Sequence, residues 1–247
     1  MRREQIIKMI RIAAIIVEIV VLTIYFFGDY IMEIFIPNQY EFPMNTKSAI
    51  IIDAVFNPFF INKAREILQR AGFNVTVKAG KAVSIRLLDG FGGYGLVILR
   101  THSAVADGFL YIFSGEAYSW RRYVIEQLHK TYRKAHTSAG EVVFALRGDL
   151  LGSERGLIGS TIILMGCNGT SSTNVIKKLF EKGVKEIITF DGYTDFGYMD
   201  TAVLAFLNYV YRNRLSCEEA VKKVMETVGA DPTWKSQMVF LGCNYGE

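Results

Sequence analysis

The sequence is poor in the residues that build disulfide frameworks and metal centres, because only three cysteines and three histidines occur among 247 residues. Three cysteines do not make a disulfide framework, although a bridge between Cys217 and Cys243 stays open as an alternative to two buried thiols. No His, Cys, Asp and Glu residues gather at the spacing of metal ligands, so we predict no bound metal. Internal repeats and low-complexity tracts are also absent.

The sequence also lacks the signatures of nucleotide and nucleic-acid binding. The glycine-rich stretch 89–95 precedes a predicted strand, whereas a dinucleotide fingerprint links a strand to the start of a helix. Basic residues gather in a predicted helix at 120–135, but they are not combined with exposed aromatic residues across the chain. We interpret this helix as a solvated face, and we predict no cofactor and no nucleic-acid partner.

One long apolar stretch stands out near the N-terminus. Residues 12–27 contain a single charge, Glu18, and the apolar character continues to residue 36. A bilayer span needs about 20 mostly apolar residues, so we predict a transmembrane helix at 12–36 that acts as a retained signal anchor. The alternative is an amphipathic helix at the membrane surface. Within a span, Glu18 either faces a partner helix in a membrane oligomer or stays protonated or close to the interface.

The charges on both sides of the stretch predict its orientation. Basic residues precede it and acidic residues follow it. The positive-inside rule then places an N-terminal tail, 1–11, in the cytoplasm and the globular domain outside the plasma membrane, as a single-pass protein. Pro37 and Pro43 mark a linker at 37–47, and the globular domain extends over 48–247.

Apolar runs alternate with amphipathic segments after the linker. We predict strands at 49–55, 73–77, 95–101, 142–146 and 184–190, a further strand that ends at Cys167, and a hairpin strand at 110–113. Helices are predicted at 58–71, 172–182, 200–212 and 216–228. This alternation is typical of an α/β fold with a mostly parallel sheet flanked by helices.

Two reactive side chains lie at the ends of two of these strands. His102 follows the run 95–101, and Cys167 ends the second run. Ligands bind at the carboxyl ends of strands in open parallel sheets, so neighbouring strands would bring an imidazole and a thiol together there. This is the arrangement of a cysteine nucleophile with an acid–base partner. Taken singly, each residue is more typical of a structural role at a strand end.

At these residues the chain resembles the caspase-like fold of clan CD cysteine peptidases, and its pattern is closest to CHAT-type domains. The resemblance covers residues 49–247 and includes a hairpin between the two reactive strands. The matching positions are His102, Cys167-Asn168-Gly169, 180–188, Asp200 and Glu219-Ala220. Ser103 departs from the glycine that usually follows the histidine, and Met165 departs from the substrate-binding aspartate of metacaspases.

The resemblance implies a role for each residue of the site. Cys167 is the nucleophile and His102 the general acid and base. Backbone N–H groups of Cys167 and Ser103 hold the oxyanion, while Gly169 keeps this loop open.

Acidic residues at strand ends predict which substrates are selected. Asp53 ends the first strand, where members of the resembled family that cleave after Arg or Lys carry an acid. Asp191 follows the strand 184–190 and can line the same crevice. The alternative for each acid is a helix cap or a turn. Arg100 is either the salt-bridge partner of such an acid or part of the sheet edge.

We therefore predict a membrane-anchored cysteine endopeptidase that uses a Cys/His dyad on peptide or protein substrates and cleaves after basic residues. The first alternative is a catalytically inactive caspase-like module that binds a peptide or protein partner. The second is a flavodoxin-like sensor of a small ligand, which also binds at strand ends.

Overall fold

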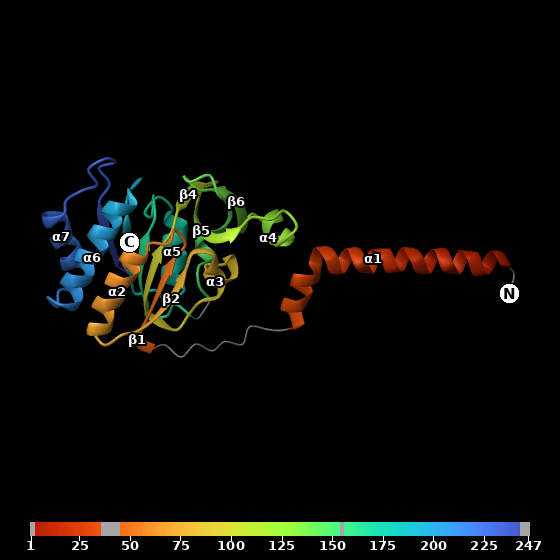
Figure 1. The fold of residues 1–247 in the computed structure, drawn as a ribbon, viewed down its shortest axis with the longest axis horizontal. Coiled ribbons are helices and arrows are strands. Elements are labelled where there is room, and N and C mark those ends of the chain that lie inside the picture. Colours follow the sequence, from red (N-terminus) through yellow and green to blue (C-terminus); the bar gives the residue numbers. More distant parts are fainter. Residues whose placement is uncertain (1–2, 36–44, 154–155, 243–247) are drawn as a thin grey trace. The chain divides into compact units, whose positions relative to one another are not determined.

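The computed structural model describes residues 3–35, 45–153 and 156–242 (Figure 1). The chain divides into two units. The smaller unit contains the helices α1 (Arg3–Phe35) and α4 (Val124–Leu128), and the larger unit contains the remaining helices and strands. The candidate site belongs entirely to the larger unit.

A six-stranded sheet forms the centre of the larger unit, in the order β10-β9-β8-β3-β1-β2. Neighbouring strands are parallel except for β10, which runs antiparallel to β9. The strands are β1 (Asn45–Asp53), β2 (Asn74–Ala79), β3 (Tyr94–Arg100), β8 (Thr161–Met165), β9 (Glu186–Phe190) and β10 (Met238–Gly242). The predicted mostly parallel sheet is therefore confirmed.

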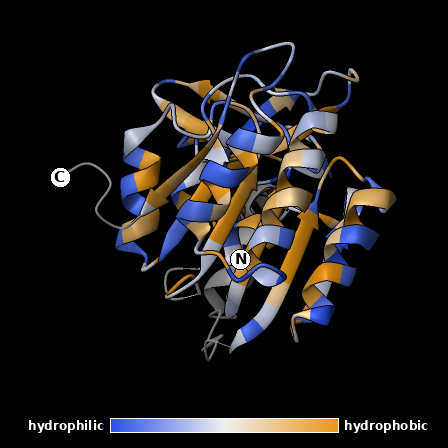
Figure 2. Cartoon of the chain, turned by 90° about the vertical axis from the view of Figure 1, so that its left-hand side faces the viewer, coloured by the Kyte–Doolittle hydropathy of each residue, from blue (hydrophilic) through white to orange (hydrophobic). Residues whose placement is uncertain are grey.

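Helices cover both faces of this sheet, which explains its nearly continuous apolar strands. Ile50, Ile51 and Ile52 of β1 are 0–1% exposed, so successive side chains are buried on opposite faces. One face packs against α2 (Pro58–Arg70), α6 (Phe196–Tyr211) and α7 (Cys217–Thr227). Figure 2 shows the central strands as hydrophobic along most of their length, whereas the covering helices alternate between hydrophobic and hydrophilic residues. The other helices are α3 (Ile85–Gly90), α5 (Thr173–Glu181) and the short η1 (Gly80–Ala82) and η2 (Gly148–Leu150).

The helices that hold the site begin at residues whose side chains accept otherwise unpaired backbone N–H groups. Asn57 caps α2, and Asp195 caps α6. Ser216 and Glu219 form the expected capping box of α7. The predicted start of α6 at Asp200 is wrong by one turn, because Asp195 supplies the cap and leaves Asp200 inside the helix.

A second, antiparallel sheet has the order β4-β5-β7-β6. Its strands are β4 (Ser103–Ala106), β5 (Phe109–Ala117), β6 (Tyr132–His136) and β7 (Val142–Arg147). The predicted helix at 120–135 is wrong, because only α4 is helical and 132–136 pairs with β7. The buried residues of β6 are Tyr132 and Ala135, which are three positions apart and so lie on opposite faces of the strand. The sequence of β6 therefore carries no alternating pattern, and pairing with β7 decides its conformation.

The predicted transmembrane helix at 12–36 is wrong. The apolar stretch is part of α1, whose sequence also carries Glu18 in its middle and charged residues towards both ends. Within residues 3–35, 45–153 and 156–242, no helix is both long enough and apolar enough to cross a bilayer. A charged residue at the centre of a membrane span raises the free energy of insertion by about 2.5–3.5 kcal/mol. Glu18 would impose this penalty on a span built from the apolar stretch.

The fold class is corrected accordingly to a mixed α/β fold with one mostly parallel and one antiparallel sheet. The predicted signal anchor and the predicted single-pass placement at the plasma membrane both depended on this span, so they are not supported. The helix α1 begins at Arg3, so it includes most of the residues of the predicted tail 1–11. Most of the predicted linker 37–47 and Cys243, the considered partner of Cys217, lie outside the described residues.

Candidate functional site

His102 and Cys167 lie at equivalent positions beyond two neighbouring parallel strands. Arg100 at the end of β3 is paired in register with Met165 at the end of β8, and each reactive residue follows two positions later. The pairing continues past the strands, because the N–H of Thr101 donates to the carbonyl of Met165 at 3.0 Å. The topology therefore brings imidazole and thiol to one edge of the sheet.

Close packing of the backbone explains the glycines around Cys167. A Cβ on Gly166 would collide with the hydroxyl of Ser103, and a Cβ on Gly169 would collide with the side chain of Thr189. Because Gly166 has no side chain, the Ser103 hydroxyl lies close to the backbone of this loop and donates to the carbonyl of Cys167 at 2.6 Å. Both glycines are thus required by the neighbouring strands, and they fix the loop that presents the thiol.

His102 is half-buried and packed against two aromatic rings. Its imidazole meets the ring of Phe196 edge-on, with centroids 5.0 Å apart, and that of Phe113 at 6.1 Å. Burial lowers the pKa of His102, and the positive charge of Arg100 lowers it further, while Glu141 acts in the opposite direction. The imidazole is therefore neutral at pH 7 and can accept a proton.

The Cys167 thiol is also half-buried and lies 3.8 Å from the carbonyl oxygen of Thr194, to which it donates. Burial raises the pKa of Cys167, and the negative charge of Asp231 raises it further. The thiol is therefore protonated at neutral pH. A neutral imidazole and a neutral thiol form a different resting state from a preformed thiolate–imidazolium pair.

A buried ionic network centred on Arg100 lies close to His102. The Arg100 guanidinium donates to both carboxylate oxygens of Asp200, at 2.7 and 3.0 Å, and to Asp53 at 3.1 Å. Its charge also lies over the ring of Phe196, 4.7 Å from the centroid, and this is the ring that supports His102. Arg100 is 3% exposed and Asp53 is fully buried. The network therefore connects the sheet, α6 and the candidate acid–base residue.

The position of Asp53 is that of a structural acid. Besides Arg100, its carboxylate accepts the backbone N–H groups of Val55, Phe56 and Asn57 at 2.7–3.1 Å. The Asp53 carboxylate is thus surrounded by hydrogen-bond donors that belong to the protein itself, and this leaves no place for a substrate cation.

Asp191 directly follows β9, which neighbours β8 on the side away from β3 and β1. It is exposed, and its carboxylate accepts the N–H of Gln237, the residue before β10, at 2.8 Å.

Gly169, the residue predicted to keep the oxyanion loop open, has its N–H engaged, since it donates to the carbonyl of Phe190 at 2.8 Å. The N–H of Asn168 likewise donates to the carbonyl of Gly192. The N–H of Cys167 donates to no backbone carbonyl among the described residues, so it stays available as a donor to an oxyanion.

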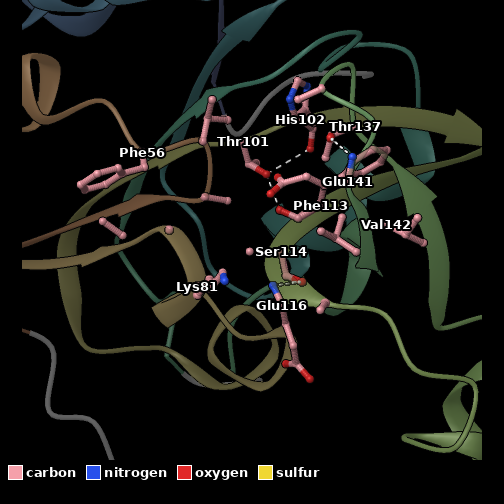
Figure 3. A pocket seen from close by; sticks show the side chains of 18 residues that line it. Phe56, Lys81, Thr101, His102, Phe113, Ser114, Glu116, Thr137, Glu141 and Val142 are labelled. Atoms are coloured by element: carbon pink, nitrogen blue, oxygen red, sulfur yellow. Dashed lines mark hydrogen bonds between the residues drawn. The ribbon is translucent and has the colours of Figure 1, made fainter.

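A pocket with a volume of about 850 Å³ opens beside His102 (Figure 3). Thr101 and His102 line it from the segment after β3. The rest of the wall comes from residues 54–56 after β1, the end of β2, η1, β5, the start of β7 and the turn between β6 and β7. The charged residues of the lining are Lys81, Glu116 and Glu141. Among the residues that the structure describes, no group of His, Cys, Asp and Glu is arranged to hold a metal ion.

Several residues of the site were missed by reasoning from the sequence. These residues come from elements that are distant in sequence from those they contact. They are Asp200, the main partner of Arg100; Phe196, which supports the ring of His102; and Glu141, which lines the pocket. The only usable signal was Asp200, which matches an aspartate of the resembled family but gives no indication of its partner. Glu141 belongs to the turn after β6, a segment that follows the wrongly predicted helix.

The raised pKa of Cys167 predicts slow alkylation at neutral pH. Iodoacetamide reacts with the thiolate, whose fraction falls about tenfold for each pH unit below the pKa. We expect the alkylation rate of Cys167 to be low at pH 7 and to rise steadily beyond pH 9, as measured by mass spectrometry of its peptide. His102→Ala should leave this profile unchanged. A rate plateau near pH 7 that disappears in His102→Ala would instead reveal an ion pair.

Comparison with protein-family models gives no match, and comparison with curated proteins gives none either. Function is therefore inferred from the geometry of the site alone.

Proposed function

We propose that the chain is a cysteine peptidase with a caspase-like arrangement, in which Cys167 is the nucleophile and His102 the general acid and base. The observation that carries the proposal is the register of β3 and β8, which brings both residues to the carboxyl edge of one sheet. The adjoining pocket offers room for part of a peptide. The half-buried positions of both side chains keep them within reach of a substrate.

The proposed reaction begins from neutral partners. The thiol proton moves to His102 while the sulfur forms a bond to the carbonyl carbon, and the carbonyl electron pair moves to oxygen. The N–H of Cys167 stabilises that oxyanion. When the carbonyl re-forms, the C–N bond breaks, and the imidazolium of His102 gives its proton to the leaving amine. Water, deprotonated by His102, then hydrolyses the thioester and restores the thiol.

The resting state of the dyad gives Arg100 a function within this proposal. Its positive charge disfavours the imidazolium, so His102 remains an available base below the pH at which a free histidine becomes protonated. Arg100 acts through the charge and through Phe196, and it is therefore a positioning residue that touches no substrate atom.

A peptide carrying an electrophilic ketone tests the proposal directly. We expect such a probe to modify Cys167 covalently when it is incubated with the full chain at pH 8, and to leave Cys217 unmodified. Cys217 is a suitable internal control, because burial raises its pKa to about 12. Intact mass and peptide mapping identify the modified residue. Equal labelling of both cysteines, or labelling that His102→Ala does not reduce, would contradict the proposal.

The second candidate is a catalytically inactive module that binds a peptide, and the burial of the Cys167 thiol favours it. In that case a peptide binds to the pocket without cleavage, and Cys167→Ala binds it as well as the parent chain. Turnover of a peptide by the parent but not by Cys167→Ala decides for the peptidase.

A further inference from the structure

The pocket beside His102 has the lining of a site for a long basic side chain. Apolar walls come from Phe56, Phe113 and Val142, which suit a methylene stem. Glu141 supplies a negative charge at the same pocket. In the view of Figure 3, His102 and Glu141 lie at one end of the pocket, and Lys81 and Glu116 lie at the other. A cationic side chain can therefore place its stem on the walls and its charge beside Glu141.

Glu141 is held in place by the turn that carries it. Its N–H donates to the hydroxyl of Thr137 at 3.1 Å, and its carbonyl accepts the N–H of Thr137 at 2.9 Å. Among the described residues its exposed carboxylate makes no hydrogen bond and no ion pair, and its negative charge acts on His102. Glu116, by contrast, accepts the N–H of Ile85 at the start of α3. Glu141 is thus the acid of this pocket that is available to a ligand.

The pocket lies on one particular side of the proposed reaction centre. Its described lining includes Thr101 and His102 but neither Cys167 nor its neighbours in the loop 166–169. In the proposed mechanism the thiol bonds to the acyl carbon, whereas His102 protonates the leaving amine. A side chain bound at the wall of His102 therefore belongs to the residue on the amine side.

We infer that this pocket binds an arginine or lysine side chain through Glu141, and that this residue is the one that follows the scissile bond. Binding of the cation rests only on the pocket and its charges, while the place of the basic residue in the substrate rests on the proposed function. This assignment replaces Asp53, whose carboxylate is buried against Arg100, as the acid that selects a basic residue.

Argininamide and citrullinamide provide the probes for the binding experiment, because they have nearly the same shape and differ in charge. Each is titrated into the full-length Cys167→Ala chain by calorimetry, so that no turnover interferes. A partly exposed ion pair contributes up to about 1 kcal/mol, so we expect argininamide to bind about fivefold more tightly than citrullinamide. Glu141→Gln should abolish this preference, and Lys81→Gln should increase it, because it removes a repelling charge.

Glu226→Gln on α7 is the matched control for the loss of one negative charge, since Glu226 pairs with Lys223 on a helix outside the pocket. It should keep the preference of the parent. Equal affinity for the two amides, or a preference that persists in Glu141→Gln, would overturn the inference.

A cleavage experiment separates this inference from the proposed function. Peptides that differ only in arginine or citrulline after the scissile bond are incubated with the parent chain, and the products are mapped by mass spectrometry. Faster cleavage before arginine, lost in Glu141→Gln, supports both proposals. Cleavage without any dependence on this position overturns the assigned place of the basic residue. Binding of argininamide without cleavage of any peptide retains the cation site and overturns the peptidase.

Discussion

Cys167→Ala is expected to lower the turnover of a cleaved peptide by roughly a thousandfold or more, because the variant loses the atom that forms the covalent intermediate. His102→Ala is expected to lower it by about 10²–10⁴-fold, the usual contribution of a positioned acid–base group. The double variant should be about as inactive as Cys167→Ala alone, since the two residues act as one unit and their losses do not multiply. Initial rates with a fluorogenic peptide measure all three.

Cys217→Ala is the control for this experiment. Cys217 is also half-buried, but it is the first residue of α7 and takes no part in the site. It should retain the activity of the parent chain. If Cys167→Ala kept more than a tenth of the parent activity while remaining folded, the nucleophile would have to be another group and the peptidase proposal would fail.

Arg100→Met is expected to reduce the free energy of unfolding by about 3–5 kcal/mol, which is the usual cost of removing one partner from a buried ion pair. The substitution leaves the carboxylates of Asp53 and Asp200 buried without their cation. Loss of the charge should also raise the pKa of His102, because Arg100 disfavours the imidazolium. Urea unfolding measures the stability, and NMR titration of the His102 ring measures the pKa.

Arg147→Met is a matched control, because Arg147 also donates to an aspartate at 2.7 Å, while its side chain is 23% exposed. A partly exposed pair of this kind contributes about 0–1 kcal/mol, so the two variants should differ clearly in stability. Equal losses in both variants would show that burial does not control the contribution of Arg100. Where Arg100→Met is too unstable to study, Arg100→Lys keeps the positive charge. A lysine cannot reproduce the guanidinium's bonds to both Asp53 and Asp200, so this variant tests the loss of those hydrogen bonds alone.

Local patterns were sufficient to predict five of the six strands of the central sheet, all but β10. The runs at 49–55 and 95–101 are apolar on consecutive residues, as strands covered on both faces must be, and they correspond to β1 and β3. The capping box at Ser216 and Glu219 was equally visible, because its hydrogen bonds lie within four residues. Elements decided by short-range geometry can therefore be located from the sequence.

The segment 120–135 shows where local patterns are insufficient. Its basic residues suit the exposed face of a helix, but 132–136 lies beside β7, and the pairing satisfies its backbone there. The N-terminal stretch is a second example. Counting apolar residues at 12–36 favoured a span, whereas the helix as a whole, with its charged residues, does not meet the requirements for one.

For the site itself, sequence alone determined that an imidazole and a thiol each end an apolar strand, because both the strands and the residues that follow them are local features. Only the tertiary structure decided that β3 and β8 are neighbours in register, and that Asp53 is occupied by Arg100 rather than by a substrate. It also decided that Glu141 lines the pocket of His102. These relations join residues separated by tens of positions, and they depend on strand order and side-chain packing, which no local pattern encodes.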